Sequence, residues 1–429
     1  MIADTIYALS SGQPPAAIAI VRISGPAAAY ALESLTGALP PPRHASLRSV
    51  RHPSTGELLD RAILLLFPGP DSSTGEDLGE LHLHGGRSVV NAVLEALGTF
   101  EGLRNAEPGE FTRRAFENGR LDLAEAEGLA DLLAAETQSQ RRAALALAGG
   151  ALSRRVEDWQ GFLLQLAATV ESLLDFADEG DVAEELPSSW TASLNALVTE
   201  LERSLRSPPA ERLRDGVRVV IAGPPNAGKS SLLNWLAGRR AAITSAIAGT
   251  TRDLIEAPTA IGGTPFLLID TAGLREGADQ LEEEGMALAR ESLGAADLVL
   301  WLGNPEDRPD PVRSILVASK ADLYSSEERR PADIHVSAET GEGMDALIAL
   351  LVERARALLP SDGEVAIRKR HRDALSECVS DLRLARSSPD LLVVAEHLRL
   401  ARAALDRITG RAGVEDMLDR LFGSFCIGK

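Results

Sequence analysis

The chain has 429 residues, and at roughly 100–200 residues per domain this length predicts several domains. Its 44 Lys and Arg residues face 63 Asp and Glu residues, so the net charge of −19 is opposite in sign to that of an autonomous nucleic-acid binder. Two cysteines exclude a disulfide framework, and no apolar run reaches the roughly 20 residues of a membrane span. Because the N-terminus also lacks a basic region before an apolar stretch, we expect a cytoplasmic protein that does not associate with membranes.

The first ~115 residues have the pattern of an α+β module, with short strands expected at residues 16–24 and 61–67. Beyond Asp122 the pattern becomes helical, because apolar residues recur at spacings of three and four along two separate segments. The first stripe is Leu152, Val156, Trp159, Leu163, Leu166, Val170 and Leu173, and the second is Leu391, Ala395, Leu398, Ala401, Leu405 and Ile408. The two stripes predict one helical bundle with a domain inserted between its halves, from about Val217 to about Leu359.

Within the insertion, apolar strands separated by polar or glycine-containing loops predict a mostly parallel α/β sheet. The expected strands are residues 217–222, 266–270, 298–302, 314–318 and 334–336. The connection from Gly303 to Arg313 contains three prolines in 11 residues, so no crossover helix is expected there.

A phosphate-binding loop is predicted where Gly223-Pro-Pro-Asn-Ala-Gly-Lys-Ser230 follows one of these strands and precedes a helical run. Backbone N–H groups of such a loop converge on phosphate oxygens, and Gly228 permits their close approach. Lys229 would reach the outer phosphates, and the Ser230 hydroxyl would bind Mg²⁺.

Two later loops predict guanine as the base. Ser319-Lys-Ala-Asp322 is similar to the N-K-x-D motif, whose aspartate accepts hydrogen bonds from two guanine donors that adenine lacks. Serine replaces the usual asparagine, so we expect the tie between this loop and the phosphate loop to be lost. Ser337 and Ala338 follow the next strand and are similar to the backbone loop that contacts guanine.

Asp270-Thr-Ala-Gly273 ends a strand and is typical of a segment that senses the γ-phosphate and organises Mg²⁺ through water. Leu274 stands where a Ras-like enzyme carries a water-orienting glutamine, so hydrolysis must use another group. Glu282, Glu283 and Glu284 are candidates, although any one of them can equally be part of a solvated helix face.

The sequence resembles the MnmE (TrmE) family of tRNA modification GTPases over its whole length. Besides the nucleotide motifs, the resemblance rests on Gly249-Thr-Thr-Arg-Asp253, taken as the first switch, and on the C-terminal Cys426-Ile-Gly-Lys429. It also includes the segments Arg22-Ile-Ser-Gly25, Thr74-Gly-Glu-Asp77, His84-Gly-Gly86 and Pro108-Gly-Glu-Phe-Thr112.

The resemblance implies a multidomain α/β protein with an N-terminal folate-binding and dimerising domain at 1–118. A helical domain would comprise 119–215 and 361–429, and a Ras-like G domain would occupy 216–360. It further implies a homodimer that forms a heterotetramer with the flavoprotein MnmG (GidA), which carries the FAD. Together they would install an aminomethyl or carboxymethylaminomethyl group at C5 of the tRNA wobble uridine, with a methylene-tetrahydrofolate as carbon donor and tRNA held mainly by the partner.

The resemblance also assigns the GTPase site. K⁺ would be held by the Asn226 side chain and by carbonyls of Ser245, Ile247 and Thr250, Mg²⁺ by Ser230 and Thr251, and Glu282 would orient the attacking water. The full set of expected GTP-binding residues is Asn226, Ala227, Gly228, Lys229, Ser230, Ser231, Ser245, Thr250, Thr251, Asp270, Thr271, Ala272, Gly273, Lys320, Asp322, Ser337 and Ala338.

The folate contacts of the family map onto Arg22, Glu80, Arg120 and Lys429, with arginine at position 120 where lysine is usual. Charged groups of this kind suit a pterin edge and a glutamate tail, but they can also be ordinary surface charges. Glu80, His82 and His84 alternate along an expected strand and therefore share one face, which leaves a zinc site as a weaker alternative. Cys426 is a possible catalytic nucleophile, or part of a tail that closes the folate pocket.

Two other functions compete with this interpretation. A ribosome-assembly GTPase would share the G-domain motifs but would need a basic RNA-binding appendage, and the concentrated basic run Arg368-Lys-Arg-His-Arg372 is more simply a solvated helix start. A folate-binding scaffold with a degenerate GTPase would be consistent with Ser319 and with the short connection from Gly303 to Arg313.

Overall fold

The computed structural model describes residues 4–175, 186–238, 255–270, 291–325, 327–361, 365–411, 415–423 and 425–429. The chain divides into two compact units, Met1–Ala130 with Asp406–Lys429 and Asp131–Leu405. We describe each unit by itself. No helix among the described residues is long and apolar enough to cross a membrane.

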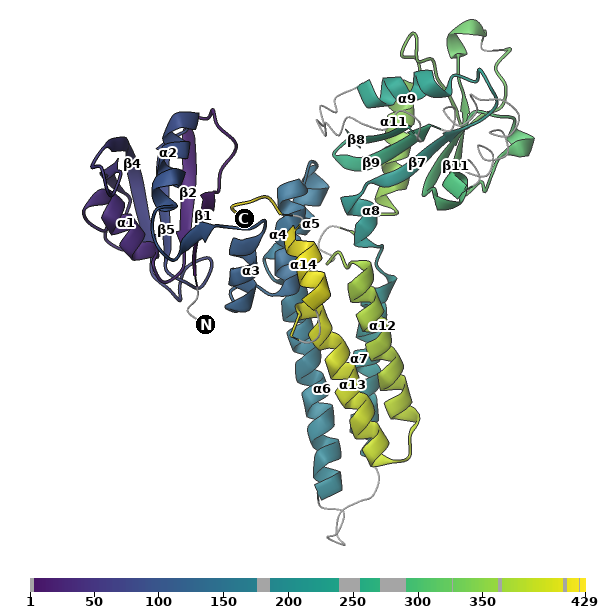
Figure 1. Ribbon diagram of the computed structural model, residues 1–429. Helices are drawn as coiled ribbons and strands as arrows, with labels where there is room; N and C mark the ends of the chain where they lie inside the picture. The colour runs from purple at the N-terminus through teal and green to yellow at the C-terminus, as the bar shows by residue number, and fades with distance from the viewer. Residues whose placement is uncertain are drawn as a thin grey trace, which may run out of the picture. The chain divides into compact units, whose positions relative to one another are not determined.

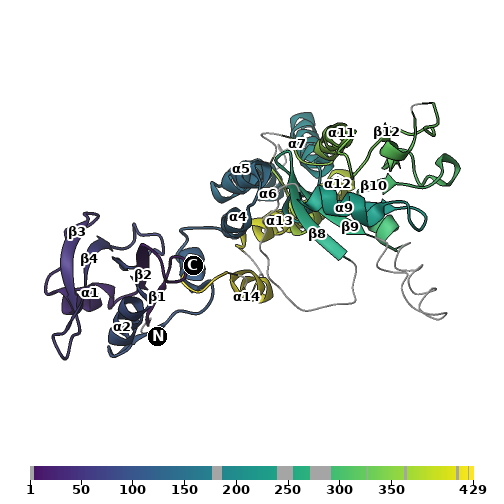
Figure 2. The same ribbon diagram turned by 90° about the horizontal axis from the view of Figure 1, so that it is seen from above.

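The first unit is built on a six-stranded sheet in the order β3-β4-β5-β2-β1-β6. The strands are β1 (Thr5–Leu9), β2 (Ile18–Ser24), β3 (Ser46–Arg51), β4 (Leu58–Phe67), β5 (Leu78–His84) and β6 (Leu103–Asn105). All neighbours are antiparallel except β1 and β6. Helices α1 (Ala28–Thr36) and α2 (Arg87–Leu97) cover the same face of this sheet (Figures 1 and 2). The predicted α+β module and both predicted strands are therefore confirmed.

Three further helices follow this sheet in the chain: α3 (Glu110–Glu117), α4 (Leu123–Ala134) and α14 (Glu415–Gly423). Helix α4 extends across the boundary between the two units. Ala126, Phe422 and Phe425 form a small apolar core with Phe116 packed against it. Beyond α14 the C-terminal tail lies against the sheet, where Ile427 forms an antiparallel bridge with Pro108. Gly428 has a φ of +92°, and a Cβ atom there would lie 2.2 Å from the Leu9 carbonyl oxygen, so only glycine fits this approach.

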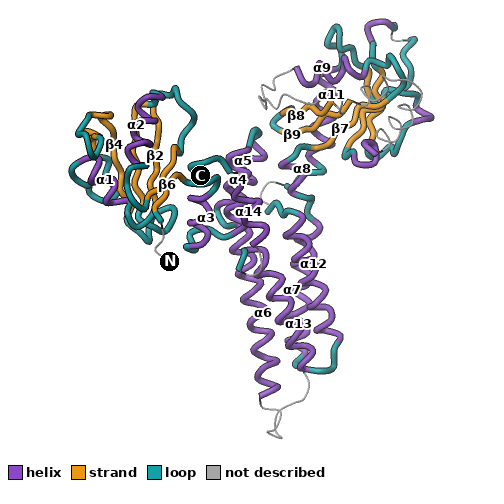
Figure 3. The backbone as a smooth tube through the Cα atoms, in the orientation of Figure 1, coloured by secondary structure: helices purple, strands orange, loops and turns teal. Residues whose placement is uncertain are grey.

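The helical part of the second unit contains α5 (Gln138–Ala148), α6 (Ala151–Asp175), α7 (Ser188–Arg206), α12 (Lys369–Ser387) and most of α13 (Leu391–Thr409). The first predicted stripe is buried from Leu152 to Val170, while Leu173 is partly exposed. Its Trp159 donates from Nε1 to Glu200 of α7 (3.1 Å), and His397 of α13 bonds Asp381 of α12 (3.0 Å). Helices before and after the insertion thus form the predicted bundle (Figure 3).

The inserted part follows α8 (Ala210–Arg214) and forms a six-stranded sheet in the order β12-β11-β10-β7-β9-β8. Its strands are β7 (Val217–Ala222), β8 (Ile255–Ile261), β9 (Thr264–Asp270), β10 (Leu298–Trp301), β11 (Ser314–Ala318) and β12 (Ile334–His335). Only β8 runs antiparallel to its neighbour, so the predicted mostly parallel sheet is confirmed.

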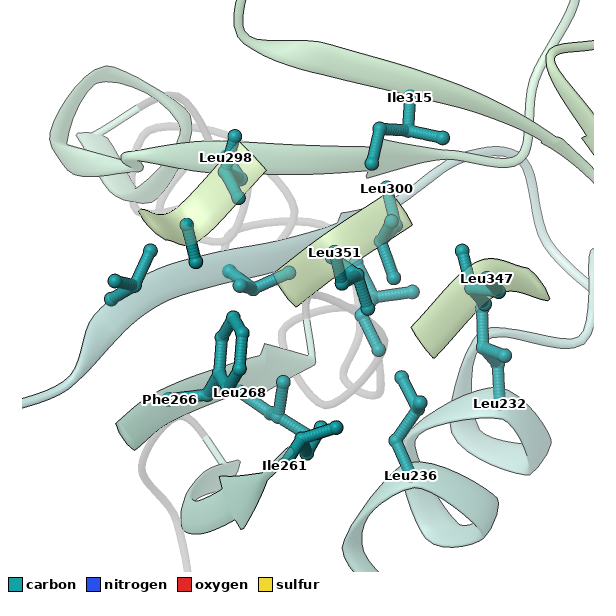
Figure 4. Close-up of a cluster of buried hydrophobic side chains, with 14 of the residues drawn as sticks. Leu232, Leu236, Ile261, Phe266, Leu268, Leu298, Leu300, Ile315, Leu347 and Leu351 are labelled. Atoms are coloured by element: carbon teal, nitrogen blue, oxygen red, sulfur yellow. The ribbon is translucent and has the colours of Figure 1, made fainter. Parts of the chain in front are cut away.

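Helices α9 (Lys229–Gly238) and α11 (Met344–Arg356) pack their apolar faces on this sheet around Leu268, Leu300 and Leu347 (Figure 4). Between Gly303 and Arg313 the structure has only a short 3₁₀ turn, η2 (Pro305–Asp307). The absence of a crossover helix in this connection agrees with its three prolines.

The basic run at the start of α12 is not a solvated helix start, which corrects the expectation from sequence. The ring of His371 is fully buried, and Arg368 pairs with Asp131 at 2.7 Å. Arg372 donates from Nη1 to the Ser207 carbonyl (2.8 Å) and from Nη2 to the Leu205 carbonyl (2.5 Å). Arginines are used here because the last carbonyls of a helix have no partners within the helix and attract cations.

Candidate nucleotide and folate sites

The phosphate loop joins β7 to α9 in the geometry that its sequence predicts. Gly228 has a φ of +87°, and since a Cβ there would meet nothing closer than 3.7 Å, its backbone conformation is the reason for glycine. Asn226 also adopts a positive φ, of 60°. Lys229 is 7% exposed, and its Nζ donates to the Gly223 (3.2 Å) and Pro224 (2.9 Å) carbonyls. The loop therefore holds a buried cation beside the start of a helix, where phosphate groups are stabilised.

Ser230 and Asp270 place oxygen atoms together at the edge of the loop. Asp270 ends β9 and is 1% exposed, and it accepts a hydrogen bond from the Ser230 hydroxyl at 2.8 Å. A hydroxyl and a carboxylate next to a phosphate site are ligands that suit Mg²⁺, bound directly or through water. The two residues predicted for this role are thus brought together by α9 and β9.

A cavity of about 640 Å³ lies beside the phosphate loop and contains the residues expected to bind the base. Among the predicted residues it is lined by Gly228, Ser231, Lys320, Asp322, Ser337 and Ala338. Ser337 is fully buried, and the backbone N–H of Val336 before it donates to Ala318, so the last loop is fixed to the end of β11. Asn234, Trp235, Leu323 and Glu339 also line the cavity and were not predicted from the sequence. The helical periodicity after Ser230 is the signal that could have located Asn234 and Trp235.

Ser319 corrects the expectation that serine loses the tie to the phosphate loop. Its hydroxyl donates to the Ala227 carbonyl at 2.6 Å, and Lys320 donates from Nζ to the Asn226 carbonyl at 2.9 Å. Lys320 itself has a φ of 58°, which directs the turn of η3 (Ala321–Leu323) toward the cavity. The shorter serine side chain therefore still joins the two loops.

Several predicted residues lie outside the residues that the structure describes. They are Ser245, Ile247, Thr250, Thr251, Thr271, Ala272, Gly273 and Glu282. The described part of the site thus comprises the phosphate loop, Asp270 and the base cavity.

Arg22 and Glu80 of the predicted folate site face each other across β2 and β5. They are register partners, and the Arg22 Nε donates to Glu80 Oε1 at 2.8 Å. His82 bonds the other carboxylate oxygen at 3.0 Å. Burial acts to raise the pKa of Glu80, but the hydrogen bonds from His82 and Arg22 outweigh it and hold the pKa below its usual 4.5.

The remaining predicted folate residues have other recorded contacts. Arg120 pairs with Asp71 at 3.6 Å, and the backbone N–H of Lys429 donates to the Cys426 carbonyl at 3.3 Å. His84, the third residue of the zinc alternative, bonds Asp60 at 2.8 Å, and the described residues contain no group of three side chains suited to a metal. The geometry therefore joins Glu80 to Arg22 and His82 without forming a zinc site.

A buried polar network beside this pair was missed by sequence reasoning. Ser24 bonds Thr74 (2.7 Å) and Glu76 (2.8 Å), and Glu76 accepts from Arg114, which is 8% exposed. The segment Thr74–Asp77 was noticed as a motif, but the pattern alone did not identify Arg114 as its partner. The network fixes the loop between β4 and β5 next to Arg22 and Glu80.

The two cysteines differ in environment. Cys426 lies exposed in the C-terminal tail, whereas Cys378 is buried in α12. Burial raises the pKa of Cys378 to about 12, with a smaller contribution from the nearby Asp381, so this thiol is inert at neutral pH.

Comparison with known proteins gives matches over nearly the whole chain. The family model described as "MnmE helical domain" matches residues 123–426, and the one described as "GTP-binding protein TrmE N-terminus" matches residues 5–120. A Rhizorhabdus wittichii protein named "tRNA modification GTPase MnmE" is 60% identical over 99% of this chain and 97% of its own length. An Erythrobacter litoralis protein of the same name is 55% identical over 99% of this chain and all of its own length.

Among solved structures, the G domain of the FeoB iron transporter of T. maritima is 28% identical. It covers 32% of this chain and 98% of its own, with a TM-score of 0.25.

Proposed function

Because this chain belongs to the MnmE family of tRNA modification GTPases, we propose that K⁺ stimulates its GTP hydrolysis and that hydrolysis controls folate-dependent modification of the tRNA wobble uridine. GTP hydrolysis in tRNA modification is the activity of the family itself. The observation that supports guanine nucleotide binding in this proposal is the phosphate loop joined by Ser319 to a cavity that contains Asp322. A carboxylate in that cavity accepts both donors of a guanine edge.

The ions have assigned roles in this proposal. Ser230 and Thr251 would hold Mg²⁺, with Asp270 beside Ser230, and the ion would supply positive charge to the phosphate oxygens. The Asn226 side chain and the carbonyls of Ser245, Ile247 and Thr250 would hold K⁺, which would supply positive charge to offset the negative charge that develops during hydrolysis. Glu282 orients the attacking water.

The N-terminal sheet binds the one-carbon donor through Arg22, Glu80, Arg120 and Lys429. The carboxylate of Glu80 accepts the donors of a pterin edge, and its low pKa keeps it ionised at neutral pH. Arginine and lysine groups meet the carboxylates of the glutamate tail. The exposed Cys426 thiol in the C-terminal tail is the candidate nucleophile of this proposal.

We assign the oxidation–reduction chemistry to the FAD of a flavoprotein partner, MnmG (GidA), which also holds most of the tRNA and assembles with a homodimer of this chain in the cytoplasm. The sheet face opposite α1 and α2 supports the homodimer, because Ile18, Leu47 and Ile63 are 59%, 56% and 42% exposed on it. The domain boundaries at residues 118, 215 and 360 belong to the same proposal.

The test is nucleoside analysis of tRNA from cells that lack this chain and from the same cells with the chain restored. We expect the C5-modified wobble uridine to disappear and return while other modified nucleosides are unchanged. Unaltered wobble uridine in the deleted strain would overturn the proposal.

The ribosome-assembly alternative is not favoured by the structure. Its expected basic appendage has one candidate in the sequence, and there Arg368 and Arg372 are bonded to other parts of the chain. These two guanidinium groups are already used to join helices.

A further inference from the structure

Helix α9, which begins at the phosphate loop, carries a large aromatic side chain beside the base cavity. Leu232 and Leu236 of this helix belong to the buried cluster on the sheet (Figure 4). Ser231 and Trp235 are also four residues apart, so they lie one above the other on a neighbouring face of the helix. Both line the cavity of about 640 Å³. The helix that starts at the phosphates therefore reaches the base cavity through Trp235.

The indole ring of Trp235 is held between the core and the cavity. The side chain is half-buried and packs against the apolar core of the inserted sheet, while it also lines the cavity. Because the core contact already orders the ring, little side-chain entropy is left to lose when a ligand packs on it. An aromatic ring fixed in this way presents a rigid apolar surface to whatever enters the cavity.

The loops after β11 and β12 supply polar groups to the same cavity, among them Lys320, Asp322 and Ser337. Lys320 donates from Nζ to the Asn226 carbonyl at 2.9 Å, so its side chain extends from the base-binding loop to the phosphate loop. These groups suit the edge of a base and the phosphates. Among the described lining residues, Trp235 is the one with an aromatic ring, and a ring is the group that suits the face of a base.

We propose that the indole ring of Trp235 packs against the guanine base of the bound nucleotide, an inference that rests on the guanine nucleotide binding of the proposed function. Every base has a π face, so an aromatic contact strengthens binding without selecting guanine, and the selection stays with Asp322. The ring also excludes water from the cavity. Hydrogen bonds to the Asp322 carboxylate are stronger in such a water-poor environment.

The positions of the tryptophans make this contact measurable. The sequence contains four of them, Trp159, Trp190, Trp235 and Trp301. Trp159 and Trp190 are buried in the helical bundle, and Trp301 of β10 packs with Val299 on the sheet face that α9 does not cover. Trp235 is the tryptophan that lines the base cavity in the described part of the chain. Contact with a base should therefore change the fluorescence of Trp235 and leave that of the other three unchanged.

The first test follows the intrinsic tryptophan fluorescence of the full chain during titration with GDP and Mg²⁺. We expect a saturable change in the unaltered chain and its loss in Trp235→Phe. Trp301→Phe is the matched control, because it also removes one half-buried indole from the inserted sheet, and it should retain the change. An undiminished change in Trp235→Phe, or loss of the change in Trp301→Phe, would overturn the inference.

The second test measures affinities for GDP and for inosine diphosphate, whose base lacks the exocyclic amine, by titration calorimetry. Trp235→Ala should weaken both about tenfold, within the range expected for one lost contact between a base and an aromatic ring. Trp235→Phe should retain most of both affinities, since it keeps an aromatic face. If Trp235 only held the loops in shape, its truncation would displace Asp322 and reduce the preference for GDP over inosine diphosphate.

Melting temperatures of the variants establish that each chain is folded. Unchanged GDP affinity in Trp235→Ala, or a reduced preference for GDP over inosine diphosphate, would overturn the inference while leaving the proposed function intact. If the unaltered chain binds no GDP, the proposed function itself fails.

Discussion

The Ser319 hydroxyl joins the base-binding loop to the phosphate loop through one short hydrogen bond to Ala227. For Ser319→Ala we expect GDP to bind about 3- to 10-fold more weakly, which corresponds to the roughly 0.5–1.5 kcal/mol of one hydrogen bond. Titration with a fluorescent GDP analogue measures this change. Ser387→Ala, which removes a hydroxyl bonded within α12, should leave the affinity unchanged. Equal affinities for all three proteins would show that the tie does not contribute.

The choice of monovalent ion also depends on a single residue, because the side-chain amide of Asn226 is one of the proposed K⁺ ligands. We expect faster GTP hydrolysis in K⁺ than in Na⁺ and loss of this difference in Asn226→Ala, with GDP affinity nearly retained since Lys229 and the loop backbone remain. Initial rates in matched chloride salts measure it. Identical rates in the two salts for the unaltered chain would contradict the K⁺ assignment.

Glu80 makes the stability of the N-terminal sheet depend on pH. Its folded-state pKa lies below the usual 4.5, so its stabilising effect is present above pH 4.5 and is lost as the pH falls through the folded-state pKa. Glu80→Gln should therefore melt at a lower temperature than the unaltered chain at pH 7, and this difference in melting temperature should close as the pH falls through the lowered pKa of Glu80. Thermal unfolding followed by circular dichroism across this range measures it. A difference in melting temperature that stays constant with pH would contradict an ionic origin of the stabilisation by Glu80.

At the scale of elements, the start of α12 holds the end of α7 through Arg372. Because two hydrogen bonds from a cation are lost, Arg372→Ala should lower the free energy of unfolding by about 1.5–3 kcal/mol. Arg383→Ala on the same helix removes an exposed ion pair with Glu202, for which about 0–1 kcal/mol is expected. Denaturant unfolding compares the two. A similar loss of unfolding free energy in both variants would contradict the role of Arg372 in joining α12 to α7.

Elements were predictable where one local signal dominates. The three- and four-residue spacing of apolar residues predicted both helical segments of the bundle, and the prolines between Gly303 and Arg313 predicted that no helix forms there. The prediction that the basic run at Arg368 is solvated was wrong, because the sequence of a basic run is the same whether its side chains contact water or the carbonyl end of another helix. Arg114 escaped for a related reason, because helix α3 and the loop that carries Glu76 are brought together only by the tertiary fold.

At the scale of the whole molecule, the charge of −19 opposes binding to a polyanion. Lys and Arg contacts with phosphates supply nearly all non-specific affinity for nucleic acid, and a net negative surface repels RNA within about 8 Å at physiological salt. We expect the isolated chain to bind tRNA weakly and the flavoprotein partner to provide most of the affinity. Titrations of tRNA into each protein and into the mixture at fixed salt measure this. Tight, steeply salt-dependent binding by this chain alone would favour the ribosome-assembly alternative.

The two segments that connect the inserted sheet to the helical bundle run side by side. The Ala210 N–H before the insertion donates to the Ile367 carbonyl after it at 3.1 Å, and the Lys369 N–H donates to Glu211. Because the cut ends are already neighbours, excision of the sheet would leave a gap that a linker of a few residues closes at little entropic cost. A module attached in this way can be gained or lost by recombination in one step, with both halves of the host bundle kept in register.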